Sequence, residues 1–342
     1  MLAELLSAPT RQGEPEYMHH LDDKNILVTG GTGSFGSAFV RTILARAKPS
    51  RVVVFSRDEL KQYEMAQSIG EDPRIRFFIG NVREYERLYR ALEGIDIVIH
   101  AAALKQVPAT EYNPYEAVKT NVMGAQHIVD AAIDQKVSRI IALSTDKASS
   151  PINLYGATKL VSDKLFVQGN AYAGKKDTRF SVVRYGNVVG SRGSIVPAFR
   201  QLAEQGRPLP ITDERMTRFW ITIKQAVGFV IDRLSDMHGG ELFVPKIPSM
   251  KVVDLAKAIA PRAPIEIIGI RPGEKLHEEM ISADIARDTR DMGSYYMCEP
   301  QGAPWYTRAD RGQACPEGFS YSSDKNPDWL TVEMLRGIVC DG

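Results

Sequence analysis

The chain has 342 residues and a mass of 38.0 kDa, enough for two domains or for one large domain with a smaller lobe. Hydrophobic residues make up 44% and charged residues 25%, which excludes a wholly disordered chain. Lys and Arg number 43 against 42 Asp and Glu, a net charge of +1, and this balance disfavours a protein that binds nucleic acid through a large basic surface.

Short β-branched runs alternate with longer helical stretches from residue 25 to about residue 185. The runs are apolar at odd and even positions alike and are rich in Val and Ile, a pattern typical of strands buried on both faces. The strand candidates lie at 25–29, 51–55, 75–79, 95–100, 139–144 and 180–184. The helix candidates lie at 35–45, 59–67, 84–92, 114–135 and 153–169. This alternation predicts an α/β fold with a doubly wound parallel sheet of the Rossmann type.

The rhythm changes after residue 185, where Gly and Pro residues divide the chain into short segments. A helix at 224–234 and a strand at 241–244 are expected to return to the sheet. The sequence therefore predicts a flexible N-terminal extension and two larger parts. The extension covers 1–22, the Rossmann domain covers 23–188 with 224–245 returning to it, and a smaller C-terminal substrate lobe covers 189–223 and 246–342.

Three glycines follow the first strand candidate directly and open the next helix. Gly30, Gly33 and Gly36 permit a tight turn, a close approach of the backbone to a pyrophosphate, and close packing of the helix on the strand. The first N–H groups of the helix and its positive dipole end then face the anion. The strand before and the helix after favour a dinucleotide site over a loop that merely needs glycine. The other residues expected at this turn are Thr32, Ser34 and Phe35.

The end of the second strand distinguishes NAD from NADP. An NAD site commonly has a carboxylate there, which binds the ribose 2′-hydroxyl and repels a 2′-phosphate. Here Ser56 can donate to a phosphate and Arg57 offers a planar cationic fork, whereas Asp58 suits the start of the next helix. We therefore expect NADP; the alternative is that Asp58 binds the ribose of NAD. Further cofactor contacts are expected after the third and fourth strands, from Asn81, Val82, Ala101, Ala102 and Ala103.

Tyr155 and Lys159 are four residues apart near the start of a helix candidate, and so they share one face. A phenol with a pKa of about 10 is a poor base at neutral pH, and a cationic neighbour lowers that pKa by favouring the phenolate. We expect Lys159 to supply this charge and to bind the cofactor ribose, while Thr145 hydrogen-bonds the reacting oxygen. Such a site removes a proton from a carbinol as hydride leaves for the cofactor.

The glycine pattern with Tyr155 and Lys159 resembles the extended short-chain dehydrogenase/reductase superfamily over about residues 25–300. More narrowly, several blocks are similar to the inverting UDP-N-acetylglucosamine 4,6-dehydratases of the pseudaminic-acid pathway. These blocks are AALKQVP at 102–108, STDKA at 144–148, NLYGATK at 153–159, RYGNV at 184–188, MTRFW at 216–220 and RPGEK at 271–275. The N-terminal extension departs from the pattern, as does Asn81, where many relatives carry Asp. Asn still accepts a hydrogen bond from adenine.

The resemblance implies a reaction without net redox: oxidation of the sugar at C4, loss of water across C5 and C6, and return of hydride to C6. By similarity, Tyr155 opens the cycle, Asp146 protonates the C6 oxygen and Lys147 removes the C5 proton. Dehydratases that retain the C5 configuration carry Asp-Glu at these two positions, so Lys147 suggests the inverting type. A lysine base must lose its usual proton, which burial near the cofactor permits. The alternative for the pair is a strand-end ion pair or loop capping.

The resemblance also implies a binding site for UDP-N-acetylglucosamine. Arg218 and Arg271 are candidates for the diphosphate, with Asn187 donating to it, and Glu274 is a candidate for the uridine ribose. Lys105 contacts the sugar or caps its own loop. Because relatives assemble through helices such as 114–135, a homo-oligomer is expected.

Two other functions stay open. One is another nucleotide-sugar enzyme, either a 4-epimerase or a 4,6-dehydratase of a different sugar; a simple epimerase has no use for the acid–base pair at Asp146 and Lys147. The other is a non-catalytic NADP-binding sensor, although such a protein can dispense with the tyrosine or the lysine that this chain keeps.

Several classes of site and location are not expected. No apolar run reaches the length of about 18 residues that a membrane-spanning helix needs, and residues 1–20 lack the basic start and apolar core of a secretory signal. The three cysteines are scattered without CxxC spacing, and the histidines are dispersed, so neither a disulfide framework nor a metal site is predicted. We expect a cytoplasmic protein with no membrane or nucleic-acid partner.

Overall fold

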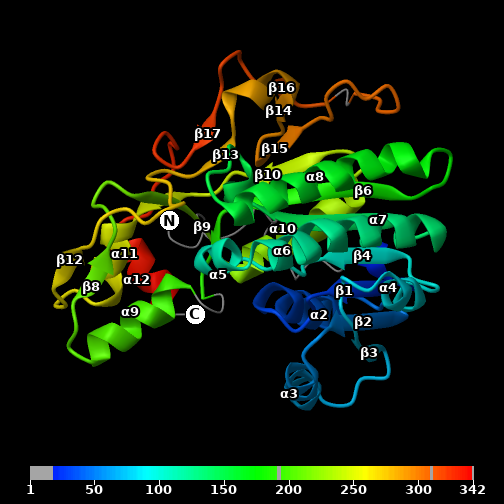
Figure 1. Cartoon of the computed structure of the whole chain (residues 1–342), viewed down its shortest axis with the longest axis horizontal. Helices are drawn as coiled ribbons and strands as arrows, with labels where there is room; N and C mark the ends of the chain where they lie inside the picture. Colours follow the sequence, from blue (N-terminus) through cyan, green and yellow to red (C-terminus); the bar gives the residue numbers. More distant parts are fainter. Residues whose placement is uncertain (1–17, 191–193, 309–310, 341–342) are drawn as a thin grey trace.

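In the computed structural model of the chain, residues 18–190, 194–308 and 311–340 are described (Figure 1). Seven parallel strands form most of a ten-stranded sheet, in the spatial order β3-β2-β1-β4-β5-β6-β10. They are β1 (Asn25–Thr29), β2 (Arg51–Ser56), β3 (Ile75–Ile79), β4 (Ile97–His100), β5 (Arg139–Thr145), β6 (Arg179–Tyr185) and β10 (Leu242–Pro245). The strand order reverses between β1 and β4, so the expected doubly wound sheet is confirmed.

Helices cover both faces of the sheet because its strands carry apolar side chains on both faces. On β1, Ile26 and Val28 pack in one core cluster while Leu27 packs in the other. The helices of the first face are α2 (Ser34–Arg46), α3 (Glu59–Ile69) and α10 (Ile223–Asp236), and those of the second are α4 (Tyr85–Ala91), α7 (Gly124–Asp134) and α8 (Leu154–Ala173). The edge strand β3 differs from the expectation of burial on both faces, because Ile79 is 47% exposed.

The expected helix at 114–135 is interrupted. After α5 (Val107–Tyr112) come α6 (Pro114–Ala117), a π-helical turn η2 (Val118–Met123) and then α7. The buried Asn121 in this turn accepts a hydrogen bond from the Leu104 backbone N–H and donates to the Leu104 carbonyl and to Thr158 Oγ1. The π-turn thereby fastens the loop after β4 to α8, two segments that border the candidate site described below.

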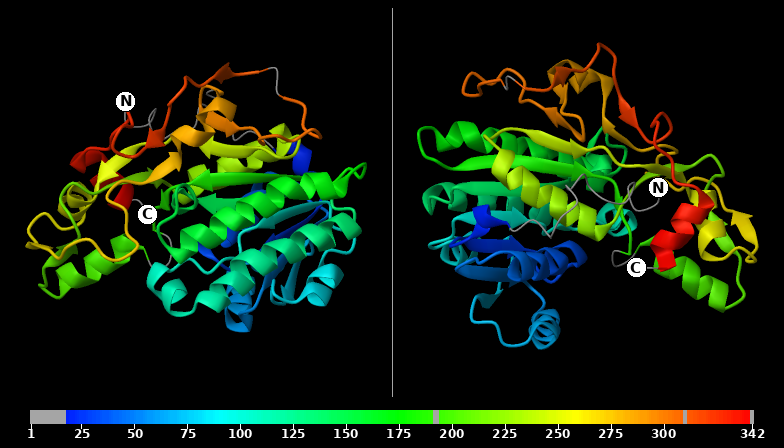
Figure 2. Two further views of the ribbon diagram at one scale, coloured as in Figure 1. Left: turned by 45° about the horizontal axis from the view of Figure 1, so that its top comes forward. Right: turned by 180° about the vertical axis from the view of Figure 1, so that it is seen from behind.

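A smaller lobe lies beside the sheet, and the views of Figures 1 and 2 agree on its position. Its core cluster contains buried apolar side chains from three short helices and from strands of two small sheets. The helices are α9 (Ile195–Glu204), α11 (Val252–Ile259) and α12 (Val332–Cys340). One sheet has β7 (Asn187–Val188), β9 (Thr217–Ile221) and β11 (Ser249–Lys251), and the other has β8 (Leu209–Ile211) and β12 (Ile265–Ile267).

The C-terminal third differs from the sequence-based division, which placed 246–342 wholly in the lobe. Three strands extend the main sheet beyond β10 with antiparallel pairing: β15 (Tyr295–Cys298), β14 (Thr289–Asp291) and β16 (Gln313–Ala314). They follow a turn η4 (Ala283–Asp288), while β13 (Glu279–Ile281) pairs with β17 (Tyr321–Ser322). These strands are too short to show a periodicity, so their place is decided by pairing with residues distant in sequence.

The expected extension at 1–22 also differs from the structure in its last residues. Residues 1–17 lie outside the described part of the chain. Residues His19–Leu21 form a 3₁₀ turn, η1, in which Leu21 is fully buried in the core cluster beside α2. The Met18 backbone N–H donates to the Arg46 carbonyl at 3.1 Å, so this segment is fastened to the domain.

Candidate active site

A cleft of about 940 Å³ lies at the carboxyl ends of β1, β2, β4 and β5 and is bounded by the smaller lobe. This is the switch point of the sheet, where open α/β sheets bind their ligands. All the residues that the sequence analysis selected for cofactor, catalysis and substrate lie along this one cleft. The structure thus brings together residues that follow strands β1 to β5 with residues of α2, α8 and the lobe.

The glycine turn after β1 fits a dinucleotide phosphate. Gly30 has φ +63°, and a Cβ atom there would lie 2.9 Å from the backbone nitrogen of Ala102. A Cβ atom at Gly36 would lie 2.6 Å from the Gly30 carbonyl oxygen, so α2 packs this closely on the turn because residue 36 is a glycine. Gly33 is the N-cap of α2 and provides no side-chain hydrogen bond to the first amides, which adjoin the cleft and suit an anion.

The end of β2 is arranged as the sequence suggested. Asp58 is the N-cap of α3: its Oδ1 accepts from the Lys61 backbone N–H at 3.0 Å and its Oδ2 lies 2.6 Å from Lys61 Nζ. Ser56 Oγ accepts from Gln62 Nε2 at 2.9 Å, while Arg57 is exposed at the cleft. The carboxylate in this turn is therefore engaged with α3. The other residues expected on the cofactor side also line the cleft: Thr32, Ser34, Phe35, Asn81, Val82 and Ala101 to Ala103.

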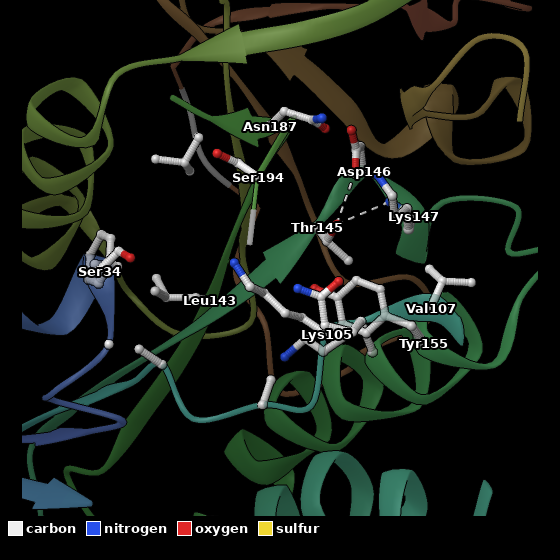
Figure 3. A pocket seen from close by; sticks show the side chains of 18 of the residues that line it. Ser34, Lys105, Val107, Leu143, Thr145, Asp146, Lys147, Tyr155, Asn187 and Ser194 are labelled. Atoms are coloured by element: carbon white, nitrogen blue, oxygen red, sulfur yellow. Dashed lines mark hydrogen bonds and ion pairs between the residues drawn. The ribbon is translucent and has the colours of Figure 1, made fainter. Parts of the chain in front are cut away.

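Three polar side chains meet where β5 ends and the 3₁₀ turn η3 (Asp146–Ala148) begins (Figure 3). Thr145 Oγ1 donates to Asp146 Oδ1 at 3.0 Å, and Lys147 Nζ donates to the same carboxylate oxygen at 3.1 Å. Tyr155, in the first turn of α8, directs its hydroxyl toward Thr145. Lys105 enters the cleft from the loop after β4, and burial lowers the pKa of its ammonium.

Asp146 is suited to hold a proton. Its side chain is 1% exposed, and its Oδ2 atom has no hydrogen-bond partner within the described part of the chain. Burial raises the pKa of this carboxyl, against the opposing effect of the Lys147 charge. A Cβ atom at Gly186 would lie 3.4 Å from Oδ2, so the glycine leaves room beside this oxygen.

Lys147 differs from the sequence-based expectation that burial frees it of its proton. Burial does oppose its charge, but the carboxylates of Asp146 and Glu278 outweigh that effect and raise the pKa of Lys147. Lys147 Nζ lies 3.1 Å from Asp146 Oδ1 and 3.0 Å from Glu278 Oε1. In the protein alone, Lys147 is therefore an ammonium held between the acidic side chains of Asp146 and Glu278.

Tyr155 and Lys159 are both in the cleft, yet their electrostatics differ from expectation. Burial raises the pKa of Tyr155 to about 12, and the opposing influences are the Lys147 charge and the hydrogen bond with Thr145. Burial lowers the pKa of Lys159, whose side chain is 3% exposed, although the nearby Asp163 charge opposes this. Within the protein, the cation that favours the Tyr155 phenolate is thus Lys147. Any further lowering of the Tyr155 pKa would have to come from a cation bound in the cleft.

The lobe contributes a chain of charges that reaches η3. The buried Arg218, on β9, donates to the carbonyls of Thr217 and Leu276, and its guanidinium lies 3.5 Å from Glu274 Oε1 and 3.8 Å from Glu278 Oε1. Arg271 is exposed at the cleft, and Asn187, on β7, also lines it. Glu274 is therefore paired with Arg218 in the protein alone.

Sequence reasoning missed Glu278. It is 2% exposed and lies against Lys147, but it stands next to Glu279 in a run that gives no sign of which glutamate points inward. The signal available was its position three residues after the RPGEK block. A second contact confirms how close these segments are: Lys275 Nζ donates to the Ser149 carbonyl at 2.6 Å.

The described residues contain no group of three or more His, Cys, Asp or Glu side chains placed to hold a metal ion. Among the helices of those residues, none combines the length and the apolar character that a membrane crossing requires.

Comparisons with known proteins agree with this geometry. A family model described as polysaccharide biosynthesis protein matches residues 26–300. The chain is 54% identical, over 92% of its length and 97% of the relative's, to the UDP-N-acetylglucosamine 4,6-dehydratase (inverting) of Campylobacter jejuni. It is 38% identical, over 93% of its length and 95% of the relative's, to the UDP-glucose 4-epimerase of Rickettsia akari.

Solved structures share the architecture. The structure of Pen from Bacillus thuringiensis is 35% identical and superposes with a TM-score of 0.87, covering 94% of this chain and 98% of that one. DesIV, a dTDP-glucose 4,6-dehydratase from Streptomyces venezuelae with NAD and TYD bound, is 26% identical with a TM-score of 0.67 over 74% of this chain and 86% of that one.

Proposed function

The chain belongs to the polysaccharide biosynthesis protein family, and we propose that it is a C5-inverting UDP-N-acetylglucosamine 4,6-dehydratase, a hydro-lyase. The observation that carries the proposal is the convergence of Asp146, Lys147 and Tyr155 at the end of β5, beside a glycine turn fit for a dinucleotide. Identity of 54% to a relative with this name supports it.

In the proposed reaction, each proton transfer is assigned to one residue of the cleft. A bound nicotinamide dinucleotide supplies the hydride acceptor for C4 and the hydride donor for C6. Tyr155, hydrogen-bonded by Thr145, takes the proton of the C4 hydroxyl. Asp146, whose raised pKa favours the protonated carboxyl, gives a proton to the leaving C6 oxygen. Lys147 takes the C5 proton, which the C4 ketone has made acidic.

We propose NADP as the cofactor, with the 23–188 region as its domain. The 2′-phosphate would meet Arg57 and the hydroxyl of Ser56, whose oxygen already accepts from Gln62. The carboxylate of Asp58 is occupied by the start of α3 and by Lys61. Lys159 lies in the same cleft and would bind the ribose. Since DesIV has NAD bound, the choice rests on these side chains and not on the fold.

The substrate's diphosphate would be bound by Arg218 and Arg271, with Asn187 donating to it and Glu274 accepting from the uridine ribose. Arg218 then has to exchange part of its contact with Glu274 for the phosphate. Lys105 would contact the sugar. These side chains stand on the lobe and on the loop after β4, so the sugar would lie between them and Tyr155.

A 4-epimerase is the second candidate, because a relative of 38% identity carries that name. Epimerisation needs Tyr155 and the cofactor but neither an acid at the C6 oxygen nor a base at C5. The pair of Asp146 and Lys147 would then have no chemical task, which favours the dehydratase.

The test is incubation of the purified protein with UDP-N-acetylglucosamine and NADP or NAD, followed by NMR of the product. A dehydratase gives a C6 methyl group, a C4 ketone and an inverted C5. An epimerase gives the C4 epimer with no methyl group and would displace the proposal. In heavy water the dehydratase product should carry deuterium at C5.

The proposal also covers the cellular location, the oligomeric state and the fate of the product. We infer a cytoplasmic homo-oligomer whose product enters a pseudaminic-acid type of pathway. On the expected assembly helices, Tyr115 is 62% exposed and Met123 is 42% exposed, and both are large apolar side chains available to a second copy. Light scattering on the purified protein measures the oligomeric state.

A further inference from the structure

Lys147 has a second carboxylate partner from the lobe. Glu278 Oε1 lies 3.0 Å from Lys147 Nζ, and the Glu278 side chain is 2% exposed. Its other oxygen, Oε2, is buried and has no hydrogen-bond partner within the described part of the chain. A buried carboxylate with a spare oxygen can receive a proton without first giving up a hydrogen bond.

The proposed reaction creates a need for such an acceptor. An ammonium has no lone pair, so Lys147 can remove the C5 proton only after one of its own protons has left. Asp146 is the first neighbour of Nζ, at 3.1 Å, but it must itself carry the proton that the C6 oxygen receives. Glu278 is the other carboxylate in contact with Nζ.

We propose that Glu278 is the positioning residue that accepts the proton of Lys147 and so generates the C5 base; this inference rests on the proposed function. One N–H bond of Lys147 breaks and its proton forms an O–H bond with Glu278. The freed amine pair bonds the C5 proton, the C5–H electrons form the C5–C6 double bond, and the C6–O bond breaks. The oxygen takes the proton of Asp146 and leaves as water, so charge and atoms balance.

The surroundings of Glu278 favour this transfer when the cleft is filled. Moving the proton converts the ion pair of the partly exposed Lys147 and the buried Glu278 into two neutral groups, and exclusion of water by the sugar favours the neutral form. The titratable and charged groups that face Glu278 are Lys147 and Asp146 from η3, Arg218 from β9 and Lys275 from its own loop, and the three cations hold its pKa low despite burial. A diphosphate on Arg218 would reduce the hold of that guanidinium, 3.8 Å away, and make Glu278 more basic.

The alternative is that Glu278 only anchors Lys147. Glu278→Gln separates the two roles because an amide oxygen still accepts a hydrogen bond from Nζ but does not take up a proton at neutral pH. Glu278→Asp keeps the carboxylate on a shorter side chain. The matched control is Glu279→Gln, which makes the same change of charge one residue away. Glu279 Oε2 accepts from Ser149 and Ser150, and a glutamine oxygen can do the same.

The experiment follows both halves of the reaction with UDP-N-acetylglucosamine. Near-ultraviolet absorbance of the reduced nicotinamide reports C4 oxidation, and NMR in heavy water reports exchange at C5 and the C6 methyl group. In Glu278→Gln we expect C4 oxidation and KM to be preserved, kcat to fall about 10²-fold or more, and C5 exchange to be lost. Glu278→Asp should recover part of kcat, and Glu279→Gln should behave as the parent protein.

Three results would overturn the inference. Glu278→Gln could turn over and exchange C5 like the parent, it could lose C4 oxidation as well, or Glu279→Gln could be equally slow. The pH profile of the elimination rate adds a further test. If Glu278 accepts a proton, the ionisation that limits elimination in the parent protein should be altered in Glu278→Gln, whereas it should be unchanged if Glu278 only holds Lys147 in place. If the parent protein itself forms no methyl product, the proposed function fails, and the inference falls with it.

Discussion

The Asn153 side chain connects the catalytic helix to the substrate loop: its Nδ2 donates to the Gly273 carbonyl at 2.7 Å. The same side chain is the N-cap of α8, because its Oδ1 accepts from the Gly156 backbone N–H at 2.8 Å. Gly273 has φ +75° and lies between the proposed diphosphate and ribose ligands of the RPGEK block. One amide group therefore sets both the start of the helix that carries Tyr155 and the position of that block.

The two functions of Asn153 can be separated by substitution. Asn153→Asp keeps an oxygen for the cap but loses the donor to Gly273, so we expect near-parental stability and a raised KM for the UDP-sugar. Asn153→Ala loses both, and its unfolding free energy should fall by about 1 kcal/mol in addition. Urea unfolding and steady-state kinetics measure the two effects. Equal stability of the Asp and Ala variants would contradict the capping role.

Tyr155→Phe should reduce turnover about 10²- to 10⁴-fold while the cofactor stays bound, because the phenol oxygen is the proposed base. Burial raises the pKa of Tyr155 to about 12 in the protein alone, so the phenolate fraction increases with pH across the neutral range. The parent rate of C4 oxidation should therefore rise with pH. Stopped-flow measurement of nicotinamide reduction at several pH values provides the check, and near-parental product formation by the Phe variant would remove Tyr155 from this role.

Arg57→Asp tests the cofactor assignment. We expect the affinity for NADP to fall about 10- to 100-fold, which corresponds to the loss of a charge-assisted hydrogen bond, and the preference to move toward NAD. Arg57→Lys keeps the charge but loses the planar guanidinium, so its NADP affinity should lie between those of the parent protein and Arg57→Asp. Titration calorimetry with both cofactors gives the affinities. If all three proteins bind NADP equally, Arg57 does not contact the 2′-phosphate.

Gly156 tests how rigid the support of Lys147 must be. A Cβ atom at Gly156 would overlap the Lys147 carbonyl oxygen, so Gly156→Ala must shift η3 or α8. We expect a loss of about 1–3 kcal/mol of unfolding free energy and a lower kcat. Gly228→Ala is the matched control in α10: no atom lies within 4 Å of its added Cβ, and the helix should gain about 0.5–1 kcal/mol. In thermal unfolding, we expect Gly156→Ala to be less stable than the parent protein and Gly228→Ala to be more stable.

The buried His100 should make the free energy of unfolding decrease at acidic pH. It is fully buried beside Phe166, with Nδ1 at 2.9 Å from Thr29 Oγ1, and burial lowers its pKa to about 3. Below the unfolded-state pKa of about 6.5, the unfolded chain binds a proton that the folded protein refuses. Stability should fall by about 1.4 kcal/mol per pH unit as the pH decreases from about 6 to 5. His100→Gln should lack this contribution in urea titrations, and an unchanged slope would contradict it.

Much of the fold was predictable because the pattern is local. β1 and β3 begin and end where the sequence analysis placed them, and the two-parity apolar pattern of β1 produced the expected helices on both faces. The family resemblance is confirmed by the family model and by the identity to curated relatives. The strands from residue 289 onward could not be placed, because a three-residue strand such as β14 has no period of its own.

The residues selected from the sequence all line one cleft, but their electrostatics could not be predicted from the sequence. The family resemblance selected Asp146 and Lys147, and the spacing to Lys159 selected Tyr155, yet the protonation of Lys147 depends on Glu278, 131 positions further along the chain (278 − 147). Which of two adjacent glutamates is buried is decided by the path of β13 and not by the residue type. The expected influence of Lys159 on Tyr155 likewise assumed a distance that helical spacing alone does not set.

The placement of β14, β15 and β16 in the main sheet has a consequence for motion. The polypeptide leaves the sheet after β6, comes back at α10, leaves again after β10 and comes back at β14 before ending in the lobe. Because several segments cross between the sheet and the lobe, any rotation of one against the other would have to bend all of these crossings together. A protease cut at one crossing would leave both halves still held by the others.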